Sequence, residues 1–264
     1  MKTSSSLAVI ICCLNWVNVA TAQTTCQWKL SADDVLRYRI EKNADVALDG
    51  GDSAYRLVQV FDVTWHVQQV DTDGNTRVEQ SIDNIRIELN DPLTDLRYDS
   101  ADEADPSGVG AMAGAVLAKL REHPLAFTLS SRGQVSDLQA VESLLEAMGK
   151  GPLADTLKAI ASADGLRNLL TSGLPVLPAQ ALVEGLSWPA ATSRTTTSFG
   201  NVDVVADYQV QTVERNDKDN SVQIGVTRKL QVQPSADAAL TIAQPESSGT
   251  IVFDCDAGRL RSSA

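Results

Sequence analysis

His66 and His123 are the two histidines of the chain, and hydrolysis by a serine nucleophile needs a histidine base. His66 falls on the polar side of a predicted strand, and His123 directly precedes the helix-breaking Pro124. The sequence has no Gly-x-Ser-x-Gly elbow to present a nucleophile. We therefore expect no catalytic residue and a protein that is not an enzyme. A hydrolase built on a pair of its 34 acidic residues is the alternative that the sequence leaves open.

The turn Asp71-Thr72-Asp73-Gly74-Asn75 gathers oxygen ligands that calcium would accept. An EF-hand loop needs glycine at its sixth position and glutamate at its twelfth, and neither requirement is met here. A zinc site needs closely spaced histidines and cysteines, and the phosphate-binding glycine loops are also lacking. We expect no metal and no cofactor, and we interpret the acidic turn as a hairpin.

The first segment, residues 1–22, has the pattern of a secretory signal peptide. Lys2 precedes an apolar stretch from Leu7 to Leu14, and Ala20-Thr21-Ala22 is a small-residue cleavage site. An uncleaved anchor would need about 20 apolar residues, roughly twice the strongly apolar length present. We expect an exported protein, periplasmic or secreted, with no integral membrane segment after cleavage.

Four cysteines are present, and Cys12 and Cys13 leave with the predicted signal peptide. Cys26 and Cys255 remain, near opposite ends of the chain. Two cysteines in an exported chain predict a disulfide, and two unpaired thiols are the alternative.

Composition supports a globular domain over residues 23–264, with 43% hydrophobic and 21% charged residues. The formal net charge of −12 repels the phosphates of nucleic acids, which therefore are not expected partners.

Alternating apolar residues predict long half-buried strands near both ends of the chain. The phase changes between Ile82 and Ile85, which predicts a β-bulge near Asp83-Asn84. Arg228 falls on the apolar side of its predicted strand. Either a bulge shifts the alternation, so that Arg228 in fact faces outward, or the inward arginine forms a buried ion pair or contacts a ligand.

In the middle of the chain the apolar period becomes helical. Helices are expected from residue 108 to Pro124 and over 139–149, 152–163 and 164–172, with two short strands between the first two. The pattern predicts one α+β domain. Its large, curved, half-barrel-like antiparallel sheet would carry this central helical insertion, about 108–172, on the concave face.

Eight short motifs follow one another along the chain: Leu36-Arg37-Tyr38-Arg39, the acidic turn, Arg97-Tyr98-Asp99-Ser100, Ser131 to Asp137, Leu174 to Pro178, Gly185-Leu186-Ser187-Trp188, Phe253-Asp254 and Gly258-Arg259-Leu260. Together they resemble an uncharacterised family of secreted bacterial proteins with many planctomycete members. The resemblance implies the fold and the compartment but no activity. The expected architecture is also loosely similar to the half-barrels of periplasmic lipoprotein carriers, which is an analogy of fold alone.

We expect a non-catalytic extracytoplasmic binding or carrier protein for a hydrophobic or lipid-like ligand. The predicted ligand contacts are inward aromatic residues and the inward arginine: Phe61, Trp65, Tyr208, Arg228 and Phe253. The alternative is a structural or protein-interaction module of the cell envelope, which contacts its partner through exposed edge strands or through the acidic loop 99–105. An edge lined by Thr195, Thr196 and Thr197 would accept a strand of the partner protein.

Overall fold

The structure, a computed structural model, describes residues 25–47, 54–90, 95–102, 109–147, 173–189, 193–197, 200–216, 219–234 and 246–263. The predicted signal peptide and the helices expected over 152–163 and 164–172 lie outside these residues.

Most of the described chain forms two antiparallel sheets of six strands each. Sheet A has the order β1-β2-β3-β5-β6, and β4 also pairs with β3. Its strands are β1 Val35–Ala47, β2 Ala54–Val70, β3 Thr76–Asn90, β4 Asp95–Asp99, β5 Leu125–Leu129 and β6 Val135–Gln139.

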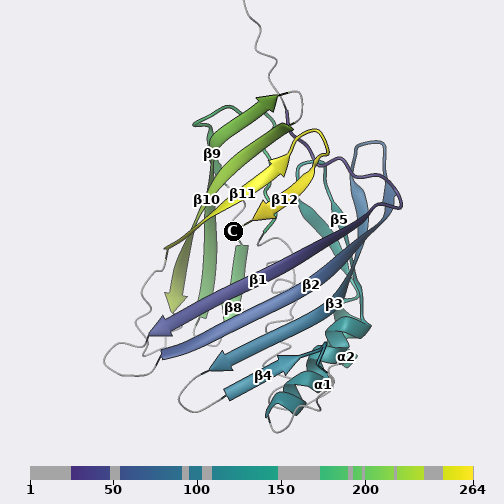
Figure 1. Ribbon diagram of the computed structural model, residues 1–264, viewed down its shortest axis with the longest axis vertical. Coiled ribbons are helices and arrows are strands. Elements are labelled where there is room, and N and C mark those ends of the chain that lie inside the picture. Colours follow the sequence, from purple (N-terminus) through teal and green to yellow (C-terminus); the bar gives the residue numbers. More distant parts are fainter. Residues whose placement is uncertain are drawn as a thin grey trace, which may run out of the picture.

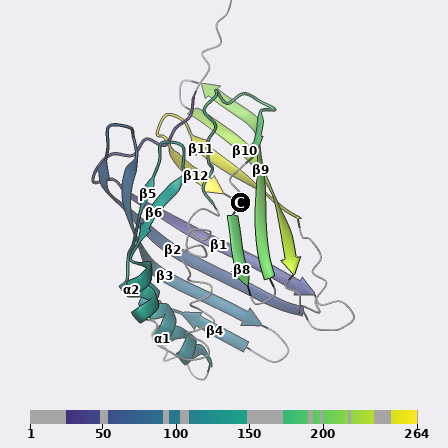
Figure 2. The same cartoon turned by 180° about the vertical axis from the view of Figure 1, so that it is seen from behind.

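Sheet B has the order β12-β11-β10-β9-β7, and β8 also pairs with β9. Its strands are β7 Ser187–Pro189, β8 Ser193–Thr197, β9 Gly200–Asn216, β10 Asp219–Pro234, β11 Glu246–Asp254 and β12 Arg259–Ser263. The long strands of sheet A cross those of sheet B, as the front and back views show (Figures 1 and 2).

Two helices accompany sheet A, α1 Val109–Glu122 and α2 Val141–Ala147. Both lie beside the β3–β4 end of that sheet (Figures 1 and 2). Leu117 of α1 packs on Phe61 and Ile85, on the face of sheet A that also carries Val63. Pro124 follows the end of α1, as the sequence predicts.

The expected α+β class with one curved, half-barrel-like sheet and a central helical insertion is wrong. Strands account for 61% and helices for 9% of the structure, so the fold is mainly β. The error has two physical causes. The stretch between the helices supplies β5 and β6, which extend sheet A beside β3, so it is not part of a helical layer. The proline-bounded segment 174–186 then leads to a second sheet.

The two sheets share one hydrophobic core. Trp65, Val78 and Phe127 come from sheet A, and Val210, Ile224 and Phe253 come from sheet B. The predicted bulge is confirmed, because Asp62 pairs with Asn84 and Val63 with Ile82, which leaves Asp83 without a partner in the register. The bulge keeps Ile82 and Ile85 on the same face, so both are buried.

Residues 26–30 form a strap that joins the two sheets. The amide of Trp28 donates to the carbonyl of Ser131 beside sheet A, and the amide of Lys29 donates to the carbonyl of Gly258 beside sheet B, both at 2.9 Å. The Cys26–Cys255 disulfide, predicted from the sequence, fixes the strap to sheet B. The alternation of Cys26, Trp28 and Leu30 in the sequence is typical of a strand with one buried face. All three residues are buried, but the segment is not a strand.

The acidic turn is the predicted hairpin between β2 and β3. One carboxylate oxygen of Asp71 accepts hydrogen bonds from the amides of Asp73 and Asn75, at 2.9 and 2.8 Å. The other accepts from the side-chain amide of Asn75 at 2.9 Å, and this contact above all lowers the pKa of Asp71. The Asp71 carboxylate is thus engaged in hydrogen bonds within the turn itself.

Candidate functional site

The aromatic centre of the molecule lies between the two sheets. Trp28 of the strap contacts Phe253 edge-on, with ring centroids 5.3 Å apart, and lies 6.2 Å from Trp65. Trp65 also makes edge contacts with Tyr38 and Phe127, at 5.2 and 5.3 Å. Such tilted and edge arrangements stabilise an aromatic core beyond the burial of area.

Four of the residues predicted to contact a ligand are buried: Phe61, Trp65, Tyr208 and Phe253 are 6%, 3%, 5% and 0% exposed. Trp65, Tyr208 and Phe253 belong to the core shared by the sheets, whereas Phe61 belongs to the cluster beneath α1. The structure therefore brings three of the four together and places the fourth in a neighbouring cluster.

Arg228 lies on the inward face of β10, so the interpretation that a bulge turns it outward is wrong. The register shift between β9 and β10 leaves Gln211 of β9 unpaired, and β10 keeps its phase from Ile224 through Arg228. Arg228 is partly buried and interacts with other groups of the protein. Burial raises the pKa of Tyr208, and the nearby Arg228 charge partly opposes this rise.

Two buried polar atoms of the aromatic centre, Trp28 Nε1 and the Tyr38 hydroxyl, have no hydrogen-bond partner among the described residues. Trp65 is different, because its Nε1 donates to Gln80 Oε1 at 2.7 Å. Tyr38 packs against both the shared core and the cluster beneath α1. Burial raises the pKa of Tyr38 to about 12, with a small opposing effect of the Arg259 charge.

We expect the free energy of unfolding to fall as the pH rises from 10 to 12. The Tyr38 pKa is about 12 in the folded state against an ordinary 10, so the folded protein holds this proton more tightly. The resulting stability is complete below pH 10 and is lost towards pH 12, by roughly 2 kcal/mol. Urea unfolding across this range should show the fall.

The matched variant is Tyr38→Phe, which removes the titrating hydroxyl and keeps the ring. Its stability at pH 7 should be unchanged or slightly higher, because the hydroxyl has no hydrogen-bond partner to lose in the part of the chain that the structure describes. An equally steep fall above pH 10 in Tyr38→Phe would contradict the assignment to this residue.

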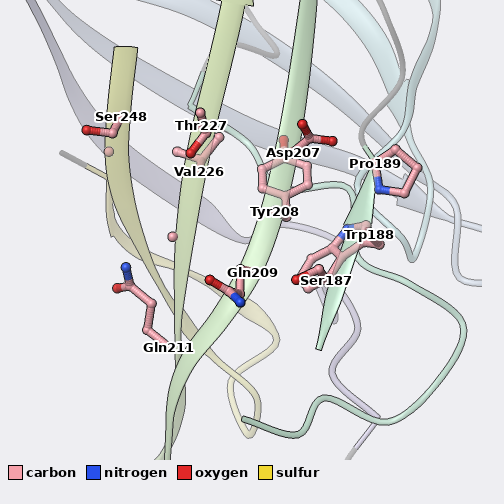
Figure 3. Close-up of a pocket in the computed structure, with 12 residues that line it drawn as sticks. Ser187, Trp188, Pro189, Asp207, Tyr208, Gln209, Gln211, Val226, Thr227 and Ser248 are labelled. Atoms are coloured by element: carbon pink, nitrogen blue, oxygen red, sulfur yellow. The ribbon is translucent and has the colours of Figure 1, made fainter. Parts of the chain in front are cut away.

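A pocket of about 420 Å³ opens on the other, outward face of sheet B. Polar side chains of β7, β9, β10 and β11 surround it (Figure 3): Ser187, Asp207, Gln209, Gln211, Thr227 and Ser248. Its base includes Gly225, where an added Cβ would lie 2.6 Å from Gln211 Nε2. The side-chain amide of Gln211 thus lies over the backbone of Gly225.

Sequence reasoning missed this pocket, although two signals point to it. The apolar phase of β9 changes between Val210 and Val213, which marks the bulge at Gln211. Gly225 interrupts the interior of a long strand, where glycine often marks the close approach of another group.

The residues that the structure describes include no group of three or more histidine, cysteine or acidic side chains placed to hold a metal ion. Within the same residues, no helix is both long and apolar enough to cross a membrane.

The fold and the aromatic centre define a two-sheet antiparallel β protein with a disulfide-linked strap. Residues 73–258, or 186 of the 264 residues, match the family of unknown function DUF6263, and the chain belongs to this family. The match extends from the β2–β3 hairpin to the turn that receives the strap. Comparison with curated proteins and with solved structures finds no match. The resemblance to an uncharacterised family is thereby confirmed.

Proposed function

We propose that this chain is a non-catalytic extracytoplasmic protein that binds or carries a hydrophobic or lipid-like ligand. The main support is an apolar strip on the inward face of sheet A, next to the shared core. Its members are only partly buried, unlike the residues of the core itself: Tyr38, Ile40, Ile87, Leu96 and Tyr98. Apolar surface that the protein does not bury completely is favourable for a hydrophobic ligand.

The position of Tyr38 adds a polar group to this strip. Its hydroxyl has no partner in the described protein and lies where the shared core meets the cluster beneath α1. A lipid-like molecule has an apolar body and a polar end, and pockets for such molecules combine an apolar lining with few polar groups. In this proposal the ligand lies on the strip, and Phe61 is buried beneath it. Trp65, Tyr208 and Phe253 support the strip from the core.

The compartment is part of the proposal. The Cys26–Cys255 disulfide suits an oxidising environment, which supports export. The proposal of a secreted, planctomycete-type branch of the family rests on the sequence motifs alone.

The test is native mass spectrometry of the chain exported from a bacterial host, followed by organic extraction of whatever co-purifies. We expect a bound apolar molecule, and we expect Ile40→Ser to lose it. Glu41→Ser is the matched control, because Glu41 is exposed and follows Ile40 on the opposite face of β1. A chain that remains free of ligand after incubation with an envelope lipid extract would overturn the proposal.

A second function has one observation in its favour. Among the described strands, β8 pairs with β9 along one side only, so its other edge is available for an added strand. As the alternative, we propose that the chain is a structural or protein-interaction module of the cell envelope. A ligand-free chain that elutes with a stoichiometric envelope protein, and loses it in Thr196→Pro, would favour the module over the carrier.

A further inference from the structure

The outward pocket of sheet B contains two features that each reduce the stability of a sheet and that meet at one point. The bulge leaves Gln211 out of the ladder between β9 and β10, and Gly225 removes a side chain from the interior of β10. Glycine in a strand interior is less favourable than alanine, because its backbone loses more conformational freedom on folding. Together they allow the Gln211 amide to lie across the sheet surface at the base of the pocket (Figure 3).

We propose that this pocket is a second binding site and that it takes a neutral saccharide. The first argument is the kind of polar group. Its amide and hydroxyl side chains belong to Ser187, Gln209, Gln211, Thr227 and Ser248. Every amide and hydroxyl both donates and accepts hydrogen bonds, and every sugar hydroxyl requires the same combination.

These groups are also available. Gln209, Gln211 and Ser248 are exposed, and their side chains make no hydrogen bond to another described residue. A ligand could therefore use them without breaking contacts of the fold. The volume of about 420 Å³ falls within the range of roughly 300 to 1,000 Å³ that small-molecule sites occupy.

The charge of the lining selects against other polar ligands. Among the described residues that line the pocket there is no lysine or arginine, and Asp207 is the charged one. The whole chain carries a formal net charge of −12. Phosphates and other anions would be repelled, and such ligands are normally held by cationic side chains. A neutral ligand rich in hydroxyl groups fits both the hydrogen-bonding groups and the charge.

This site is independent of the proposed hydrophobic ligand. The polar side chains of the pocket lie on the outward face of sheet B, whereas the apolar strip lies on the inward face of sheet A. Tyr208 also borders the pocket, but it is 5% exposed and belongs to the shared core. Loss of one activity should leave the other intact, so the two proposals can fail separately.

The experiment follows ¹H–¹⁵N spectra of the exported full chain during titration with cellotetraose, maltotetraose and the tetramer of N-acetylglucosamine. We expect at least one of the three to shift the amides of Gln209, Gly225 and Thr227 and the side-chain amide of Gln211. Glucose 6-phosphate at the same concentration should shift them less. The shifts should persist when sodium chloride is raised, since a neutral ligand owes little to charge.

Two variants test the site itself. Gly225→Val fills the base of the pocket with a residue that favours strands, and the three atoms nearest an added Cβ all belong to the flexible Gln211 side chain. Its saccharide affinity should fall at least tenfold. Gln231→Ala alters an exposed residue farther along the same outward side of β10 and should stay within twofold of the parent.

Three results would overturn the proposal: no saccharide shifts the pocket amides, binding disappears with added salt, or Gly225→Val binds as well as the parent. A folded spectrum of Gly225→Val, checked first, separates loss of binding from loss of structure.

Discussion

Removing the Cys26–Cys255 disulfide should lower the free energy of unfolding by about 4 to 5 kcal/mol. The two cysteines are 229 residues apart, and in the chain-entropy account a bridge restricts the unfolded chain more as the loop it closes becomes longer. The double variant Cys26→Ala, Cys255→Ala removes the bridge without leaving a thiol. Guanidinium unfolding of this variant and of the oxidised parent gives the difference.

Reduction of the parent provides the control, because it removes the same bridge and keeps both side chains. The reduced parent and the double variant should agree within about 1 kcal/mol. If neither differs measurably from the oxidised parent, the strap is held by its hydrogen bonds and by Trp28, and the bridge contributes little.

Trp28→Ala has the second large expected effect, a loss of about 3 to 5 kcal/mol, which is typical when a large buried aromatic residue is truncated. Trp28 is 3% exposed and contacts Trp65 of sheet A and Phe253 of sheet B. The cavity would open between the two sheets, where neither sheet can close it alone. Urea unfolding measures the loss.

Trp28→Phe distinguishes packing from hydrogen bonding. This variant keeps an aromatic ring and removes Nε1, which has no partner in the described protein, so its loss should be clearly smaller than that of Trp28→Ala. Gln27→Ala, a change at the neighbouring residue on the other side of the strap, should cost less than 1 kcal/mol. Equal losses in Trp28→Phe and Trp28→Ala would contradict a packing role.

Features that depend on neighbouring residues were predictable from the sequence. The turn at Asp71, the bulge at Asp83 and the end of α1 before Pro124 each depend on the local backbone preferences of a few residues. The alternation of apolar and polar residues also predicted the inward faces of β2 and β10 correctly. Arg228 lies on the inward face of β10, as the alternation indicated, and no bulge in β10 reverses its side.

The division into two sheets was not predictable in this way. Alternation shows which face of a strand is buried but not which strand lies beside it. Cys26, Trp28 and Leu30 alternate because they lie between two sheets, and their segment joins no ladder. The same limit applies to the site, since an inward aromatic residue such as Phe253 has the same pattern in a closed core and in a ligand groove.

The strap also limits the order in which the parts of the fold can form. Ser131, which accepts a hydrogen bond from the strap, comes more than 100 residues later in the chain. The second acceptor, Gly258, and the disulfide partner, Cys255, come more than 220 residues later. During synthesis, the β2–β3 hairpin can form early, but Trp28 cannot contact Phe253, and Lys29 cannot donate to Gly258, until β11 and the turn after it are present. Contacts this distant in sequence slow folding. A nascent chain that lacks β11 therefore leaves Trp65 and Phe127 without part of the core that covers them in the folded protein.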